Sequence, residues 1–247
     1  MKHLENKVAL VTGGSRGMGA AIVKRLADAG ANVVFTYVRS AVKAEQLARD
    51  VAQSTGRKVL PILADSASQE AVANAVDTVI SQLGGIDILV NNAGIYGESP
   101  LEEQTPDQYD RIMDVNVRAV YIASVAAARH MTAGGRIISI GSNMADHVAN
   151  RGATLYSMSK SALIGMTKGM ARELGPKGIT VNLVQPGPVD TDMNPADGAH
   201  AASQVARLAL GHFGKAADIA SLVAYLASPE SGYITGTALT IDGGSNA

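Results

Sequence analysis

A phenol and an ammonium group stand four residues apart in Y-S-M-S-K, at Tyr156 and Lys160. In a helix this spacing places both side chains on one face, close enough to interact. A phenol has a pKa of about 10, too high for easy proton exchange near neutral pH, and a neighbouring cation favours the phenolate and lowers that pKa. The pair is therefore a candidate general acid and base. Such pairs also occur by chance on solvated helices, so the elements that surround the pair must decide.

Short apolar runs alternate with longer amphipathic stretches along the rest of the chain, and these elements must position the pair. The runs lie at 8–12, 33–36, 59–63, 86–90, 136–140, 179–184 and 238–241. Because most of them are continuously hydrophobic and rich in β-branched residues, they predict interior strands of a parallel sheet of about seven strands. Pro61 moves the third strand toward an edge of the sheet or a strand end.

Helices are predicted between these strands, over 20–29, 41–54, 69–83, 156–174 and 218–227, with one long helix or two over 106–129. The alternation predicts an α/β fold, a Rossmann-like doubly wound parallel sheet with helices on both faces. Without an internal repeat or a linker, residues 1–247 are expected to form a single domain. Residues 190–215 have the weakest pattern and follow a strand. We expect a mobile substrate lid there, with an ordinary surface loop as the alternative.

The composition of the 247-residue chain narrows the class of protein. Hydrophobic residues make up 47% and charged residues 17%, and the net charge is −1, so nucleic acid is not expected as a partner. The absence of cysteine excludes disulfides and thiolate metal sites, and the five histidines lack the spacing of a metal site. The N-terminus lacks the pattern of a signal peptide, and no apolar run approaches the ~18 residues of a membrane span. We therefore expect a cytoplasmic protein with no membrane partner and no bound metal.

A glycine-rich segment, T-G-G-S-R-G-M-G at 12–19, lies between the first predicted strand and the first helix. Gly13, Gly17 and Gly19 follow a G-x-x-x-G-x-G spacing. Residues without a Cβ let the backbone turn sharply and approach a pyrophosphate, and the helix N-terminus offers unpaired N–H groups to it. The segment is therefore a candidate dinucleotide site. The alternative is a glycine-rich turn that binds no ligand.

The end of the second predicted strand bears on the choice of dinucleotide. An NAD site usually carries Asp or Glu here, which accepts hydrogen bonds from the adenosine ribose, and Tyr37 cannot do so. Arg16 in the glycine loop and Arg39 just past the strand are placed to meet a 2′-phosphate, which a planar guanidinium recognises. We therefore predict NADPH rather than NADH. The alternative for Arg39 is a solvated loop residue.

Further polar residues follow other predicted strands, at the edge where ligands bind in such folds. They include N-N-A-G at 91–94, Ser142 in S-I-G-S, and P-G-P-V-D-T at 186–191. Ser142 could bond a substrate oxygen or cap a turn. Asn116 lies in an apolar helix and is either a satisfied core amide or part of a polar network. The kinase pattern G-x-x-x-x-G-K-[ST] does not occur, and the hydrolase pattern G-x-S-x-G is matched only by G-G-S-R-G at 13–17, within the glycine-rich segment.

Together these motifs resemble those of the short-chain dehydrogenase/reductase family. The resemblance extends from Val8 to Gly244 and rests on T-G-x-x-x-G-x-G at 12–19, N-N-A-G, Asn116, Ser142, Y-x-x-x-K, P-G at 186–187 and D-G-G at 242–244. Each motif is weak alone. Their order, and their places at successive strand ends, argue against a chance match.

The resemblance implies a role for each catalytic residue. Tyr156 would be the general acid in carbonyl reduction and the base in alcohol oxidation, and Lys160 would lower the pKa of Tyr156 and bind the nicotinamide ribose. Ser142 would hold and polarise the substrate carbonyl, and Asn116 would hold a water that links Lys160 to solvent. The hydride would come from the nicotinamide.

The resemblance also implies a set of cofactor contacts. Asp65 would contact the adenine, residues 92–94 the adenosine ribose, and Val189 and Thr191 the carboxamide. The expected contacts in full are Gly13, Ser15, Arg16, Gly17, Met18, Gly19, Tyr37, Arg39, Asp65, Asn92, Ala93, Gly94, Tyr156, Lys160, Pro186, Gly187, Val189 and Thr191.

Within the family, the chain is most similar to 3-oxoacyl-acyl-carrier-protein reductases. This implies a 3-oxoacyl substrate and a carrier protein that docks at Arg129 and Arg172, or else a small ketone; the segment at 190–198 departs from the acyl reductase pattern. It also implies a homotetramer formed through the helices around 106–129 and 156–174 and the last strand. The alternatives are an NAD-dependent secondary-alcohol dehydrogenase and a non-enzymatic dinucleotide sensor, in which a damaged Ser–Tyr–Lys set would be expected. Substrate preference would depend on side chains such as Met144, His147 and Asn150.

Overall fold

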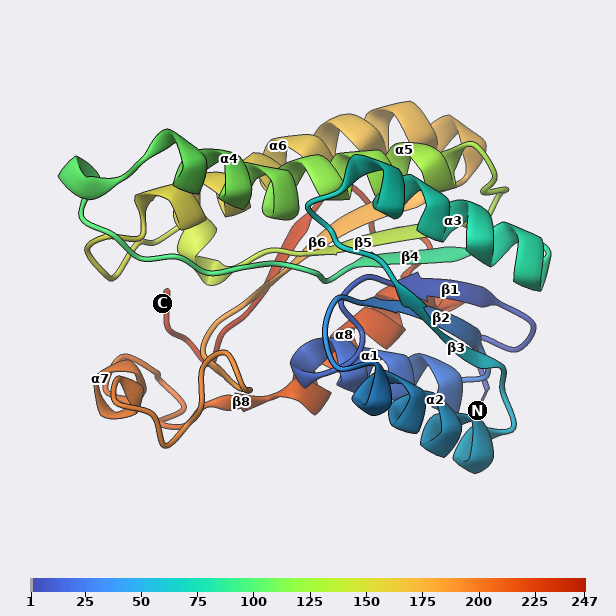
Figure 1. Cartoon of the computed structure of the whole chain (residues 1–247), viewed down its shortest axis with the longest axis horizontal. Coiled ribbons are helices and arrows are strands. Elements are labelled where there is room, and N and C mark those ends of the chain that lie inside the picture. Colours follow the sequence, from blue (N-terminus) through green and yellow to red (C-terminus); the bar gives the residue numbers. More distant parts are fainter. Residues whose placement is uncertain (1) are drawn as a thin grey trace.

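A computed structural model of the chain describes residues 2–247 and has a seven-stranded sheet at its centre (Figure 1). The strands are β1 (Val8–Val11), β2 (Asn32–Tyr37), β3 (Val59–Leu63), β4 (Ile88–Asn91), β5 (Arg136–Ile140), β6 (Thr180–Pro186) and β9 (Ala238–Ile241). They lie in the order β3-β2-β1-β4-β5-β6-β9, and each neighbouring pair is parallel. This confirms the predicted sheet, and it places Pro61 on an edge strand, where a residue without an N–H is tolerated.

Helices cover both faces of the sheet (Figure 1). One face carries α1 (Gly17–Asp28), α2 (Ala41–Thr55) and α8 (Ala216–Ala227), and the other carries α3 (Gln69–Leu83), α4 (Pro106–Met113), α5 (Ala119–Ala128) and α6 (Thr154–Leu174). The central strand β1 serves both cores: Ala9 and Val11 pack on the first side, Val8 and Leu10 on the second. The fold is therefore the predicted single-domain, doubly wound α/β arrangement. None of the helices within residues 2–247 combines the length and apolarity needed to cross a membrane.

Two helical stretches differ most from the prediction, while α6 and α8 each begin two residues earlier than predicted. Helix α1 begins at Gly17 rather than Ala20, because the last glycines of the loop already form its first turn. The stretch over 106–129 is two α-helices joined by a π-helical turn, Asp114–Arg118. Such turns are frequent at functional sites, and this one carries Asn116.

Residues 190–215 contain short elements that the sequence pattern did not predict. Strand β7 (Val189–Asp190) pairs in parallel with β8 (Gly214–Lys215) as a separate small sheet, and α7 (Ala201–Val205) lies between them along the chain. Strands of two residues are too short to show a hydrophobic period. In Figure 1 the orange ribbon of this region projects at the lower left of the molecule, below the end of α4.

Candidate active site

Tyr156 and Lys160 lie in the first turns of α6, as the spacing predicted. The Lys160 ammonium nitrogen Nζ is 5.8 Å from the centre of the Tyr156 ring. It donates a hydrogen bond of 2.9 Å to the backbone carbonyl of Ile140, the last residue of β5. Lys160 is 5% exposed, so a helix and a strand end together hold its charge away from water.

Burial shifts the pKa of both groups. Removal from water raises the pKa of Tyr156 above its ordinary value, and a side-chain hydrogen bond with Ser142 acts in the opposite direction. Burial lowers the pKa of Lys160 to about 8. The direction for Tyr156 is opposite to the lowering expected from the nearby cation. The physical reason is that the phenol has lost its hydration, while the ammonium is directed to a carbonyl of β5.

The buried ammonium of Lys160 predicts a stability that rises with pH. Its pKa is lower in the folded protein than in the unfolded chain, so the unfolded chain binds more protons between pH 8 and about 10.5. The free energy of unfolding of the cofactor-free protein is expected to increase by about 2 kcal/mol from pH 8 to pH 10. Above pH 10 the raised pKa of Tyr156 opposes this gain. Urea unfolding measured across this range tests it, and Lys160→Met should abolish the rise; an equal rise in that variant would contradict the assignment.

Ser142 follows β5 and caps the short 3-10 turn Asn143–Ala145. Its Oγ accepts a hydrogen bond of 3.2 Å from the Met144 backbone N–H. Because one lone pair is used in this way, the hydroxyl proton is free to point at another acceptor. Ser142 therefore caps a turn, which was one of the two alternatives that the sequence left open. It also lies beside the phenol of Tyr156.

Asn116 is part of a buried polar network rather than an isolated core amide. Its Oδ1 accepts from the Ile95 N–H at 2.9 Å, and its Nδ2 donates to the Ile95 carbonyl and to Ser159 Oγ, both at 3.0 Å. Ser159 in turn donates to the Tyr156 backbone carbonyl at 2.7 Å. The amide thus ties the segment after β4 to the helix turn that carries Tyr156.

The glycine loop connects β1 directly to α1, and close packing leaves no room for a side chain at several of its glycines. Gly13 has φ +64°, and a Cβ there would lie 3.0 Å from the Ala93 Cα. A Cβ on Gly19 would lie 2.2 Å from the Gly13 carbonyl oxygen and 2.6 Å from Asn92 Nδ2. Asn92 Nδ2 donates to the carbonyls of Thr12 and Gly13 at 2.9 and 3.0 Å, so the N-N-A-G segment braces the loop from the next strand.

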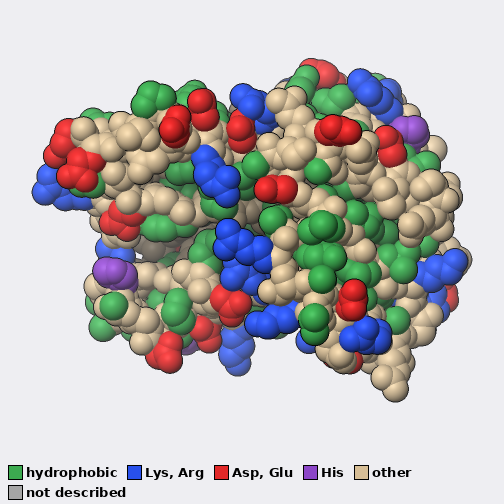
Figure 2. All heavy atoms as spheres, viewed as in Figure 1, with side chains coloured by type: hydrophobic (Ala, Val, Ile, Leu, Met, Phe, Trp, Pro, Cys, Tyr) green, Lys and Arg blue, Asp and Glu red, His purple; other side chains and the backbone are tan. Residues whose placement is uncertain are grey.

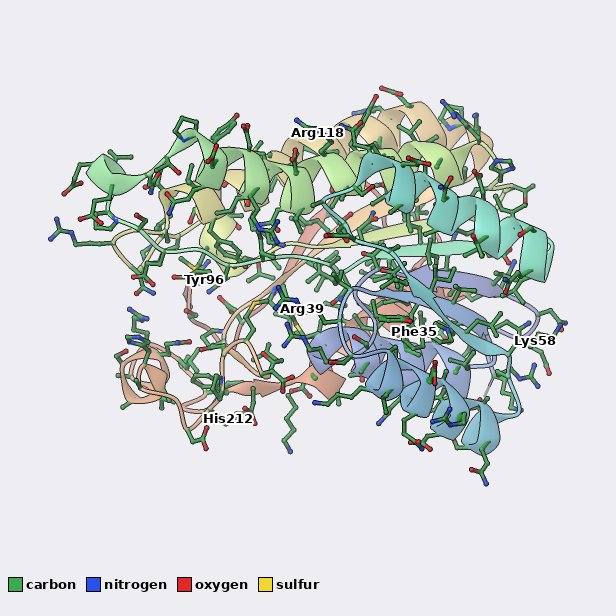
Figure 3. The ribbon with its side chains drawn as sticks, viewed as in Figure 1. Phe35, Arg39, Lys58, Tyr96, Arg118 and His212 are labelled. Carbon is green, nitrogen blue, oxygen red and sulfur yellow. The ribbon has the colours of Figure 1, made fainter. Side chains whose placement is uncertain are left out.

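Gly17 and Arg16, two of the expected phosphate contacts, lie on the open side of this loop. Gly17 has φ +53°, and a Cβ there would fill the space in front of Thr191, 3.5 Å away. Arg16 lies 3.7 Å from Asp192, and both side chains are largely exposed. Because such an exposed ion pair contributes only ~0–1 kcal/mol to stability, another anion can replace Asp192 as the partner of Arg16. Arg39 is exposed near the same edge of the sheet, at the centre of Figure 3.

The remaining expected cofactor residues line up along the same edge. Tyr37 is the last residue of β2, and Asp65 follows β3 with its Oδ1 bonded to the Ala67 N–H. Gly94 brings the backbone close to Lys160 and Asn116, since a Cβ there would lie 3.3 Å from Lys160 Nζ and 3.4 Å from Asn116 Oδ1.

A cavity of about 580 Å³ opens beside Ser142 and Tyr156. Figure 2 shows the hollow on the left of the molecule, between the lobe that contains α4 and the lobe that contains α7. Expected residues on its wall are Met18, Ser142, Tyr156, Pro186, Gly187, Val189 and Thr191, together with Met144, His147 and Asn150. The 190–215 region adds Met193, Asn194, His200, Ser203, Gln204 and Arg207.

Tyr96 and Glu98 also line this cavity and were missed in the sequence. The Tyr96 ring meets the Tyr156 ring edge-on, with centroids 5.0 Å apart, and its hydroxyl donates to Glu98 at 2.9 Å. Burial and Glu98 raise the pKa of Tyr96 to about 12. Figure 3 labels Tyr96 at the upper border of the hollow. Its position two residues after N-N-A-G was the available signal, but an irregular segment has no period from which to place a side chain.

Arg129 and Arg172 are not part of this site. Arg129 ends α5, and Arg172 lies in the last turn of α6, whereas Tyr156 lies at the start of that helix. At 1.5 Å rise per residue, Arg172 is about 24 Å along the helix from Tyr156.

Comparison with known proteins places the chain in a family. A family model described as Enoyl-(Acyl carrier protein) reductase matches residues 13–246. The cyclic-di-GMP-binding biofilm dispersal mediator protein of Escherichia coli K12 is 46% identical over 245 residues, which cover 98% of each chain. The 3-oxoacyl-[acyl-carrier-protein] reductase of Vibrio cholerae serotype O1 is 40% identical, again over 98% of each.

A solved structure gives the same placement. The crystal structure of a short chain dehydrogenase from Burkholderia cenocepacia J2315 in complex with NADP is 56% identical, with a TM-score of 0.97 over 99% of this chain and 100% of that one. Both the sequence motifs and the strand order agree with this likeness. The chain belongs to the short-chain dehydrogenase/reductase family of NAD(P)-dependent oxidoreductases.

Proposed function

We propose that the protein is an NADPH-dependent reductase that transfers hydride to the carbonyl of a ketone or 3-oxoacyl substrate, with Tyr156 as the general acid. The observation that carries this proposal is a cavity beside the glycine loop with Ser142 and Tyr156 on its wall and the buried Lys160 ammonium 5.8 Å from the Tyr156 ring. In the reverse direction the same groups would support alcohol oxidation.

The residues present fit a nicotinamide dinucleotide. The glycine loop and the start of α1 would hold the pyrophosphate, Arg16 and Arg39 the 2′-phosphate, and Lys160 the nicotinamide ribose. The solved Burkholderia relative contains NADP, which supports the same choice here. When bound, the nicotinamide supplies the hydride.

The chain's own groups would handle the proton and the developing charge. Ser142 would donate its hydroxyl proton in a hydrogen bond to the substrate carbonyl oxygen, because its other side already accepts from Met144. Tyr156 would donate its proton to that oxygen as it gains negative charge, and the raised pKa keeps the phenol protonated and ready near neutral pH. Lys160 would stabilise the phenolate that remains. Asn116 would hold a water that links Lys160 to a solvent proton relay, through which the phenolate regains its proton.

The class of substrate rests on the cavity and on a relative. The cavity of about 580 Å³ would hold part of the cofactor as well as the substrate, because Pro186, Val189 and Thr191 lie on its wall. The Vibrio relative is named for a 3-oxoacyl substrate, which supports that class. Residues 190–215 would act as the substrate lid, since they form one wall of this cavity. Arg129 and Arg172 would remain available to a carrier protein on the outer ends of α5 and α6.

We also propose a cytoplasmic homotetramer. Exposed apolar side chains such as Leu101, Tyr109 and Tyr121 on the α4–α5 side offer a surface for another subunit. Light scattering of the purified protein measures the assembly state.

The proposal is tested by incubating the protein with NADPH and a panel of ketones that includes an acetoacetyl thioester. Oxidation of NADPH is expected with at least one carbonyl. Faster turnover with NAD and a secondary alcohol would favour the dehydrogenase alternative. Binding of NADPH or cyclic di-GMP without any turnover would favour a dinucleotide sensor, the alternative that the name of the E. coli relative brings forward.

Replacing Arg39 with alanine is expected to weaken NADPH binding about 10- to 100-fold and to leave NADH binding within about twofold. The lost group is a charge-assisted donor to the 2′-phosphate, which NADH lacks. Titration of both cofactors by nucleotide fluorescence measures the effect. Arg49→Ala, which removes an exposed arginine paired with Glu45 on α2, is the matched control. Equal weakening of both cofactors in Arg39→Ala would show that this arginine does not read the phosphate.

A further inference from the structure

The D-G-G motif forms a rigid turn after β9. The Asp242 carboxylate accepts hydrogen bonds from the backbone N–H groups of Gly244 and Asn246, both at 3.0 Å. Gly243 and Gly244 have φ +64° and +77°, a conformation that side chains rarely adopt. The turn formed by residues 242–246, which we name the 242–246 turn, is therefore held closed by the Asp242 carboxylate, and its two glycines permit the positive φ angles that it needs.

This turn is wedged between two parts of the site. A Cβ on Gly187 would lie 2.5 Å from the Asp242 Cβ, so the segment after β6 packs tightly against the start of the turn. On the other side, the Leu210 N–H donates to the Gly243 carbonyl at 3.1 Å, and a Cβ on Gly244 would lie 2.6 Å from the Ala209 Cβ. The turn thus joins the segment after β6 to the end of the 190–215 region.

Asn246 connects the 242–246 turn to Asn143, the residue next to the catalytic serine. Its Nδ2 donates to the Asn143 backbone carbonyl at 2.8 Å, and its Oδ1 accepts from Asn143 Nδ2 at 3.2 Å. Asn143 directly follows Ser142 and is 7% exposed, so this two-point pairing lies in a protected environment. Ser245 and Asn246 also line the substrate cavity.

The other restraints on the serine segment come from the core. Gln185 Nε2 on β6 donates to the Ser142 carbonyl at 3.2 Å and to Asp146 at 2.9 Å, and Ser161 Oγ on α6 donates to the Ala145 carbonyl at 2.8 Å. These bonds hold the two ends of the segment. Asn246 adds a further restraint at Asn143, the residue that directly follows Ser142.

We propose that Asn246 is a positioning residue for Ser142, acting through Asn143, and that the 242–246 turn is the fixed wall of the substrate cavity. This inference rests on the proposed reductase function, because Ser142 has a catalytic role only there. Loss of the Asn246 amide would leave the Asn143 Nδ2 without this acceptor and allow the Ser142 hydroxyl to move. Cofactor binding, which depends on the loop after β1, would be preserved.

The test combines kinetics with hydrogen exchange on the full-length protein. Asn246→Ala is expected to lower kcat for carbonyl reduction about tenfold, the rate equivalent of one net hydrogen bond, with the NADPH Kd unchanged within about twofold. In a Ser142→Ala background, measured by single turnover with excess enzyme, the same substitution should lower the rate by less than about twofold. Asn74→Ala, an exposed asparagine on α3, is the control.

Amide hydrogen exchange of the cofactor-free protein gives a second measurement that does not depend on activity. Exchange of the peptide spanning 142–147 is expected to rise in Asn246→Ala and to stay unchanged in Asn74→Ala. Unchanged exchange, or a rate loss as large in the Ser142→Ala background as in wild type, would overturn the inference. If the wild-type protein reduces no carbonyl while exchange still responds to Asn246→Ala, the proposed reductase function is wrong. The restraint of the 142–147 segment by Asn246 is then still supported.

Discussion

Tyr156→Phe is expected to lower carbonyl reduction by about 10²- to 10⁴-fold, the usual contribution of a positioned general acid. The substitution removes one oxygen and keeps the ring, so the edge-on contact with Tyr96 at 5.0 Å survives and the cavity keeps its shape. The NADPH Kd should therefore stay within about threefold, because the loop after β1 is untouched. Steady-state kinetics with the best carbonyl of the panel, together with a fluorescence titration of NADPH, measure both quantities.

Tyr233→Phe is the matched control for this variant, because Tyr233 is fully exposed and lies outside the cavity wall. It should retain wild-type turnover. A Tyr156→Phe protein with activity close to wild type would refute the role of Tyr156 as the general acid. A variant that loses NADPH binding as well as turnover would instead indicate that the Tyr156 hydroxyl is needed to hold the cofactor.

Gly19→Ala is expected to reduce NADPH affinity more than 100-fold and to lower the free energy of unfolding by about 1–3 kcal/mol, the usual effect of overpacking. The new methyl carbon would overlap the Gly13 carbonyl oxygen at 2.2 Å and Asn92 Nδ2 at 2.6 Å. Both are backbone or tightly bonded groups, so the loop must move and the Asn92 bonds to it must break. Cofactor titration and urea unfolding report the two effects separately.

Gly85→Ala controls for the general effect of adding a methyl group to a glycine. A Cβ at Gly85 would meet no other atom of residues 2–247 within 4 Å, and its backbone is outside the left-handed region. Its stability and its NADPH affinity should match wild type. If Gly19→Ala bound NADPH normally, close packing of the loop would not be what makes the phosphate site.

The sheet could be predicted because each strand is a continuous apolar run bounded by turns, and the strand with Pro61 duly lies at an edge. Elements without such a run could not be predicted. Strands β7 and β8 have two residues each, and the π-helical turn around Asn116 reflects side-chain bonds to Ile95 and Ser159 from distant parts of the chain. No local period records a contact of that kind.

The residues of the candidate site likewise fall into those that the sequence pattern predicts and those that it does not. The glycine loop, Ser142, Tyr156 and Lys160 follow strand ends or helix spacings, so their convergence could be anticipated. Tyr96 and Asn246 stand in irregular segments, and only the folded chain brings them to the cavity. The direction of the Tyr156 pKa was also missed, since it depends on how completely the phenol is removed from water.

The small sheet of β7 and β8 has a consequence for how this enzyme can be redesigned. It joins Val189 to Gly214 and Asp190 to Lys215, and so holds the two ends of residues 191–213 side by side. Once the ends of a loop are joined, doubling its length costs only about 0.6 kcal/mol of closure entropy. Residues 195–207, which lie between Thr191 and the contacts of Ala209 and Leu210 with the 242–246 turn, are thus a replaceable cassette. Longer or unrelated loops inserted there should leave Ser142, after β5, and Lys160, on α6, in place.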